Sequence, residues 1–100
     1  MIQGTTPTHI FNIPFDTSLV KEVKIIYAQD DSIIFTKTID DCVLEDKTIR
    51  TTLTQKDTFL FTTGKEVQIQ LRVLTKKDVA LASVIKKVSC CKCLDNEVLQ

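Results

Sequence analysis

The stretch Val67–Leu74, with the sequence VQIQLRVL, decides the fold class of this chain. Its apolar and polar residues alternate from Val67 to Val73, so one face is apolar and the opposite face carries Gln68, Gln70 and Arg72. Successive side chains of a β-strand point to opposite faces, and a period of two is typical of a strand with one buried face. The stretch therefore predicts a half-buried strand, and its buried residues are Val67, Ile69, Leu71 and Val73.

The composition of the 100-residue chain favours strands along its whole length. Thr, Ile and Val number 14, 11 and 9, against only 3 Ala. Branched Cβ atoms lose rotamer freedom in helices and pack well on a pleated surface. With 43% hydrophobic and 26% charged residues, 2 Gly and 2 Pro, the chain belongs to neither the disordered nor the low-complexity class. Its length suits one domain.

Further alternating runs lie on both sides of this stretch. They predict strands at residues 9–15, 20–29, 32–39, 42–44, 48–53 and 80–89, separated by polar turns. Asp30-Asp31-Ser32 is expected to turn the second and third of these into a hairpin, and Thr54–Asp57 to form a single helical turn. No helix long enough for a parallel crossover separates any two strands. The prediction is an all-β protein, an antiparallel two-sheet sandwich of immunoglobulin-like type with about seven strands.

We expect one sandwich domain at residues 9–94, preceded by an extended lead-in at 1–8 and followed by a mobile tail at 95–100. Pro14 predicts a sheet edge or a strand end, because proline cannot donate a backbone hydrogen bond. The core should be formed by the apolar faces of the alternating runs. These residues are Phe11, Ile13, Val23, Ile25, Phe35, Ile49, Leu53, Val67, Ile69, Leu71 and Val73.

The charge of the chain argues against nucleic acid as a partner. Thirteen basic residues balance 13 acidic ones, whereas binders of nucleic acid usually carry a basic excess that neutralises phosphates. Residues 1–7 have neither the basic nor the apolar region of a secretory signal, and no apolar run approaches the roughly 18 residues of a membrane helix. We therefore expect no membrane partner and folding in the cytoplasm.

The four cysteines, Cys42, Cys90, Cys91 and Cys93, are expected to be reduced thiols. Three of them crowd into one tetrapeptide, which is a poor framework for disulfides. Zinc sites usually combine two separated Cys pairs, so a metal site made of all four cysteines is an alternative that we rank below buried, unligated thiols. We expect no metal and no cofactor.

No catalytic residues are predicted, and we expect the protein not to be an enzyme. His9 is the only histidine, and any triad mechanism would have to use it. It begins an apolar strand with no carboxylate nearby in sequence, so we interpret it as a solvated histidine at a strand end. The pairs Asp30-Asp31 and Asp40-Asp41 lack the spaced oxygens of a calcium loop and are expected to be solvated turns.

Six segments together resemble a family of small proteins encoded in prophages of Gram-positive gut bacteria. They are residues 4–8 (GTTPT), 11–16 (FNIPFD), 53–58 (LTQKDT), 67–73 (VQIQLRV), 80–83 (ALAS) and 93–99 (CLDNEVL). The resemblance spans nearly the whole chain, but the family has no assigned catalytic or binding residues that could be transferred. In its strand pattern the chain is also distantly similar to the N-terminal β-sandwich of phage upper baseplate proteins, which attach components of the tail tip to one another.

This resemblance implies a non-enzymatic structural or adaptor protein of a prophage, associated with the tail or baseplate. Its partners would be other phage structural proteins or further copies of itself, and it would lie in the bacterial cytoplasm when expressed and in the virion tail after assembly. The alternative is a small phage-encoded protein that binds a host factor in the cytoplasm. A carbohydrate-binding sandwich is disfavoured, because the chain has no Trp and one Tyr.

Overall fold

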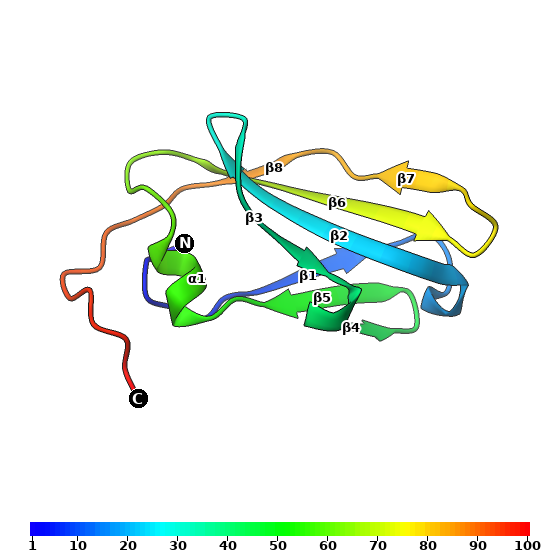
Figure 1. Cartoon of the computed structure of the whole chain (residues 1–100), viewed down its shortest axis with the longest axis horizontal. Helices are drawn as coiled ribbons and strands as arrows, with labels where there is room; N and C mark the ends of the chain where they lie inside the picture. Colours follow the sequence, from blue (N-terminus) through cyan, green and yellow to red (C-terminus); the bar gives the residue numbers. More distant parts are fainter.

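Eight strands arranged in two antiparallel sheets make up nearly half of the chain, as the computed structural model of residues 1–100 shows (Figure 1). The predicted all-β, sandwich-like class is therefore confirmed. In chain order the elements are β1 (Thr8–Asn12), η1 (Thr17–Leu19), β2 (Val20–Gln29), β3 (Ser32–Thr38), η2 (Ile39–Asp41), β4 (Cys42–Glu45), β5 (Thr48–Thr52), α1 (Gln55–Phe59), β6 (Val67–Thr75), β7 (Ala80–Ala82) and β8 (Lys86–Val88).

The smaller sheet has the strand order β1-β5-β4, and the larger one has the order β3-β2-β6, with both β7 and β8 paired to the free side of β6. In Figure 1 the long strands β2 and β6 lie in one layer, and β1, β5 and β4 form the other. β1 is an edge strand that ends at Asn12, two residues before Pro14, as expected for a residue without a backbone N–H. The predicted strand at residues 9–15 therefore extends too far at its C-terminal end, since the observed strand ends at Asn12.

The hairpin of β2 and β3 has the predicted turn. Asp30 and Asp31 adopt φ angles of 51° and 62°, and Gln29 pairs with Ser32 on either side of them. Two consecutive residues with positive φ are the mark of the tight turn whose twist matches that of the flanking strands, and Asp tolerates this region better than most residues. The turn thus fixes the pairs next to it, Gln29 with Ser32 and Ala28 with Ile33, and a bulge between Ala28 and Tyr27 then shifts the register of the rest of β3 by one residue.

The core lies between the sheets. Every residue predicted for it is buried except Phe35, which is half-buried and packs against the core from outside. Phe35 is less buried than predicted because β3 is an edge strand, which has a neighbour on one side only. The alternation of β6 is observed as predicted, since Val67 is fully buried and Arg72 is exposed. The core also includes Val20, Tyr27, Phe61 and Cys90.

The single strand predicted at residues 80–89 is wrong. The chain instead forms β7 and β8, and β6 pairs with both: Arg72 lies opposite Ala82, but Ile69 lies opposite Lys86. This change of register by one residue is a bulge, and it directly follows Ser83, which still lies opposite Leu71. The Ser83 hydroxyl accepts a hydrogen bond from the Leu71 N–H, and the Ser83 N–H donates to the Leu71 carbonyl, both at 2.9 Å. A side chain therefore replaces one backbone partner in the ladder. Because two strands form where one was predicted, the structure has eight strands and not seven.

The predicted helical turn is the five-residue helix α1, and it begins with a capping box. The Thr54 hydroxyl accepts from the Asp57 N–H at 3.1 Å, while the Asp57 carboxylate accepts from the Thr54 N–H at 2.9 Å. The two interactions satisfy amide groups that would otherwise lack partners at the helix start.

No helix of the structure is long and apolar enough to span a membrane.

The lead-in at residues 1–8 folds back on its own chain. The Gln3 N–H donates to the Cys91 carbonyl and the Cys91 N–H to the Met1 carbonyl, at 3.0 and 2.8 Å. Gly4 then reverses the chain with a φ of 77°, and its Cα lies against the Phe59 ring, where a Cβ would come within 2.7 Å of a ring carbon. The lead-in is thus a bonded part of the molecule rather than a uniformly extended arm.

The C-terminal segment beyond residue 94 runs away from both sheets and passes beside α1 (Figure 1). One side chain holds it there: the Gln55 amide accepts from the Leu99 N–H at 2.8 Å and donates to the Leu99 carbonyl at 2.9 Å. The Gln55 side chain thereby forms the pair of hydrogen bonds that a backbone residue of a neighbouring strand would form, and it fixes the backbone of the tail at this point.

Candidate functional site

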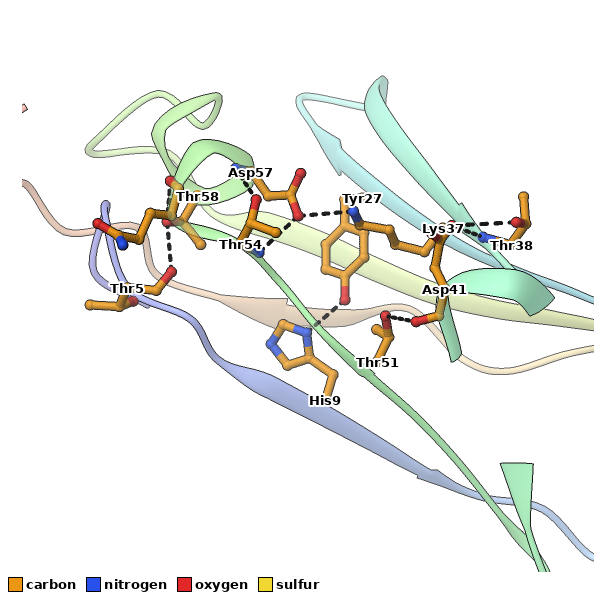
Figure 2. Close-up of polar contacts among 11 residues, drawn as sticks. Thr5, His9, Tyr27, Lys37, Thr38, Asp41, Thr51, Thr54, Asp57 and Thr58 are labelled. Atoms are coloured by element: carbon orange, nitrogen blue, oxygen red, sulfur yellow. Dashed lines mark hydrogen bonds and ion pairs between the residues drawn. The ribbon is translucent and has the colours of Figure 1, made fainter. Parts of the chain in front are cut away.

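The ionisable and polar side chains enclosed by the two sheets form the first candidate site, and Figure 2 shows them. Nδ1 of His9, on β1, lies 2.6 Å from the hydroxyl oxygen of Tyr27, on β2, so the contact joins the two sheets. His9 is half-buried, and the interpretation of it as a solvated strand end is wrong. Its position follows from the pleat, because His9 shares the face of Phe11, which is buried.

Both members of this pair are held in their neutral forms. Burial lowers the pKa of His9, and the terminal ammonium of Met1 and the charge of Lys86 lower it further. Burial also raises the pKa of Tyr27 far above its usual range, with Cys42 and Asp57 contributing in the same direction. The Tyr27 side chain has no exposed surface, so no substrate can reach its hydroxyl. The pair is suited to joining the sheets and not to acid–base catalysis.

Aromatic rings surround the Tyr27 side chain. Its ring stacks on that of Phe35 with centroids 4.9 Å apart, and the ring of Phe61 lies 6.1 Å from Tyr27 and 5.3 Å from Phe35. Tilted and offset arrangements of this kind are the favourable ones for aromatic rings. The three rings form one packed aromatic cluster in this part of the core.

Lys37 and Asp57 form the one ion pair in which both side chains are mostly buried. Their charged atoms are 2.9 Å apart, each side chain is 17% exposed, and the Lys37 ammonium lies 5.4 Å from the centroid of the Phe35 ring. Burial alone would raise the pKa of Asp57, but hydrogen bonds from Lys37 and from Thr54 outweigh it and hold this pKa below its usual value. The pair links edge strand β3 to the cap of α1 (Figure 2).

The cysteines predicted as an alternative metal site lie in different places. Cys42 belongs to β4 and its thiol donates to the Thr38 carbonyl at 3.2 Å, while Cys90 is buried next to the lead-in and Cys91 is exposed. Cys93 is half-buried. No three His, Cys, Asp or Glu side chains of the molecule are grouped in a way that could hold a metal ion. Burial raises the pKa of Cys42 and of Cys90, which makes both poor nucleophiles.

The predicted acidic turns are used by the fold. Asp30 pairs with Lys65 at 2.7 Å, and Asp31 exchanges hydrogen bonds with the Gln68 amide. The Asp41 carboxylate accepts from the Thr38 N–H, and its backbone carbonyl accepts from the Thr51 hydroxyl. These carboxylates close turns, and none is grouped with others as a cation site would require.

The second candidate site is the surface of the larger sheet that points away from the core, here called the outer face. A shallow hollow of about 320 Å³ lies on it. Its lining includes Ala28, which is buried, and two exposed isoleucines: Ile33 is 65% and Ile85 is 50% exposed. The residues that line the hollow or flank it on the outer face are Glu22, Lys24, Ile26, Ala28, Asp31, Ile33, Gln68, Gln70, Arg72 and Ile85.

Sequence reasoning placed three of the polar residues of the outer face correctly but did not identify it as a surface of interest. The period-two pattern of β6 shows which residues point outward, and it places Gln68, Gln70 and Arg72 there. The contribution of Ile85 depends on the bulge at Ser83, which the sequence pattern did not reveal.

Fold and site together define a small all-β protein whose interior polar groups serve its structure and whose outer face exposes apolar side chains beside charged ones of both signs. No family model, curated protein or solved structure matches this chain. The class stated here therefore depends on the structure itself.

Proposed function

We propose that this chain is a non-enzymatic structural or adaptor protein of a prophage, associated with the tail or baseplate and acting through protein–protein contacts. The observation that carries the proposal is the outer face, where Ile33 and Ile85 are at least half exposed around a shallow hollow. Exposed apolar groups that are contiguous and rimmed by polar residues are typical of protein-binding surfaces. The resemblance to small prophage proteins supplies the tail as the place of action.

The free sheet edges support the same proposal. β3 pairs with β2 on one side only. Apart from this pairing, no backbone N–H or C=O group between Ser32 and Lys37 forms a hydrogen bond within the chain. An extended segment of a partner can add to such an edge through backbone hydrogen bonds. The opposite edge of the same sheet is formed by the short strands β7 and β8, which carry Lys86 and Lys87 and suit pairing less well.

Mass spectrometry of particles purified after induction of the prophage tests this function. We expect the protein to band with the particles in a density gradient and to remain with tails separated from capsids. A phage protein without a structural role, such as the lysis enzyme, serves as the control that should be absent. Absence of the chain from washed particles, together with its recovery in complex with a bacterial protein from the cytoplasm, would overturn the proposal in favour of host-factor binding.

A further inference from the structure

Two like charges lie side by side on the outer face. Lys24 of β2 and Arg72 of β6 are directly opposite each other in the antiparallel register, and both side chains are exposed. Neither takes part in an ion pair of the structure. The acidic Glu22 shares this face and lines a pocket with both side chains, but it forms no ion pair with either. Like charges at opposite positions of a sheet repel each other, so an anionic group bound between Lys24 and Arg72 would relieve the repulsion. The apolar hollow begins immediately beside them, at Ile26.

The C-terminal segment Leu94–Leu99 has the complementary character. It carries Asp95 and Glu97, and two of its leucines are strongly exposed: Leu94 is 97% and Leu99 is 71% exposed. The Gln55 amide binds the backbone of Leu99 and leaves its side chain in solvent. The segment is thus partly ordered before it meets a partner, which lowers the entropy cost of docking.

The spacing of Glu97 and Leu99 in the C-terminal segment matches the spacing of the residue rows on the outer face. Along an extended segment, Glu97 and Leu99 lie on the same side and are about 7 Å apart, because a strand rises by about 3.3 Å per residue. On the outer face, the row of Lys24 and Arg72 and the next outward row of Ile26 and Gln70 are also two residues apart along their strands. A carboxylate at the basic pair therefore places an apolar side chain over the hollow.

We propose that the segment Leu94–Leu99 of one copy docks on the outer face of a second copy, with Glu97 between Lys24 and Arg72 and Leu99 over Ile26. The two contact surfaces are different, so the contact is head-to-tail, and each added copy presents a free outer face or a free segment to the next. The inference goes beyond the proposed function, because this assembly requires no other phage component.

Pairing of two copies through their β3 edges is the other way in which the chain could self-associate, and charge opposes it. In antiparallel pairing of two β3 strands, the turn at Asp30-Asp31 of one copy would approach Asp40-Asp41 of the other. Acidic residues would then meet at both ends of the shared ladder, and like charges brought together across an interface are unfavourable.

Sedimentation of the purified full chain tests the proposal. The segment is short, so we expect weak association, with a weight-average mass that rises between about 10 μM and about 1 mM and falls when salt is added. Arg72→Glu and Glu97→Lys should each lower the association constant about tenfold or more, and the double variant should recover most of the loss. Lys47→Glu, which makes the same charge change in the turn between β4 and β5, should have no effect.

Mixing two variants that each lack one of the two contact surfaces gives the most decisive test. A chain that lacks residues 94–100 keeps its outer face, and the Arg72→Glu chain keeps its segment, so each alone should be monomeric while the mixture forms a complex of one copy of each. Folding of every variant is checked by its thermal unfolding transition. A wild-type chain that stays monomeric throughout, a truncated chain that associates as wild type does, or an equal loss in Lys47→Glu would each overturn the proposal.

Discussion

The hydroxyl oxygen of Tyr27 and Nδ1 of His9 lie 2.6 Å apart, and this contact joins the five-stranded sheet to the three-stranded one. The two residues are 18 positions apart in the chain, the Tyr27 side chain is fully buried and His9 is half-buried, and the ring centroids are 5.5 Å apart. Because burial, together with the charges of the N-terminus and Lys86, lowers the pKa of His9, this histidine makes the stability of the sandwich depend on pH.

The stability of the protein should fall as the pH drops below the ordinary His pKa of 6.5. The pKa of His9 is lower in the folded state than in the unfolded state, so below this pH the unfolded chain binds more protons. The loss should continue, at up to about 1.4 kcal/mol per pH unit, until the folded pKa is reached. Urea unfolding of wild type and of His9→Gln between about pH 5 and about pH 8 measures it.

His9 is the only histidine, so His9→Gln should remove most of the pH dependence in this interval. An equally steep pH dependence in the His9→Gln variant would contradict the assignment to this side chain.

Asp57→Asn should destabilise the protein by about 1–2 kcal/mol, because it removes the charge from an ion pair and a helix cap that are largely shielded from water. The pKa of Asp57 lies below its ordinary value, so its contribution is present above the unfolded pKa and is lost as the pH falls through the folded pKa. Denaturant unfolding at neutral pH gives the difference.

The control for this variant is Asp78→Asn, which removes the charge from the exposed pair with Lys21. The side chain of Asp78 is 76% exposed, so this change should cost less than about 0.5 kcal/mol. Asn also suits the φ of 61° at this position. Equal losses in the two variants would show that the burial of the Lys37–Asp57 pair has no energetic consequence.

The alternation of single strands could be predicted from the sequence, because side-chain direction in a strand depends on local geometry alone. It located β2 with its observed bounds and the buried face of β6. The same parity rule placed Phe11 and Ile13 in the core, and it extends to His9, which lies on the same side of β1. The solvated interpretation of His9 gave too much weight to its position at the start of a strand.

The break at Ser83 could not be predicted, because it results from bonds between residues 12 positions apart. Nothing in the sequence ALASVIKKVS marks Ser83 as the residue that replaces a backbone partner of Leu71. The ion pair of Lys37 with Asp57 was missed for a similar reason, since it depends on how the edge of one sheet meets α1. Contacts of this kind are decided by tertiary packing.

Ser83→Ala should cost about 1–2 kcal/mol, because it leaves the half-buried Leu71 N–H without its acceptor. The amide proton of Leu71 should also exchange with solvent faster than those of its neighbours on β6, because hydrogen bonding protects amide protons locally. Residue-resolved hydrogen exchange measures this effect. Ser89→Ala is the matched control, since the Ser89 side chain forms no hydrogen bond and the residue is exposed.

Ile69→Ala should destabilise the protein by about 2–5 kcal/mol, the usual range for emptying an aliphatic site in a core. Ile69 is 3% exposed and lies opposite Tyr27 in the ladder between β2 and β6, so the cavity would open beside the ring that contacts His9. Urea unfolding at neutral pH gives the loss, and the pH dependence assigned to His9 should weaken in this variant because water gains access to the pair.

Ile10→Ala provides the comparison, because Ile10 is also an isoleucine on a strand but is 57% exposed on the opposite surface of β1. Its replacement should change stability by less than about 1 kcal/mol. If Ile69→Ala cost as little as Ile10→Ala, the buried face assigned to β6 would be wrong, and with it the orientation of Gln68, Gln70 and Arg72 on the outer face.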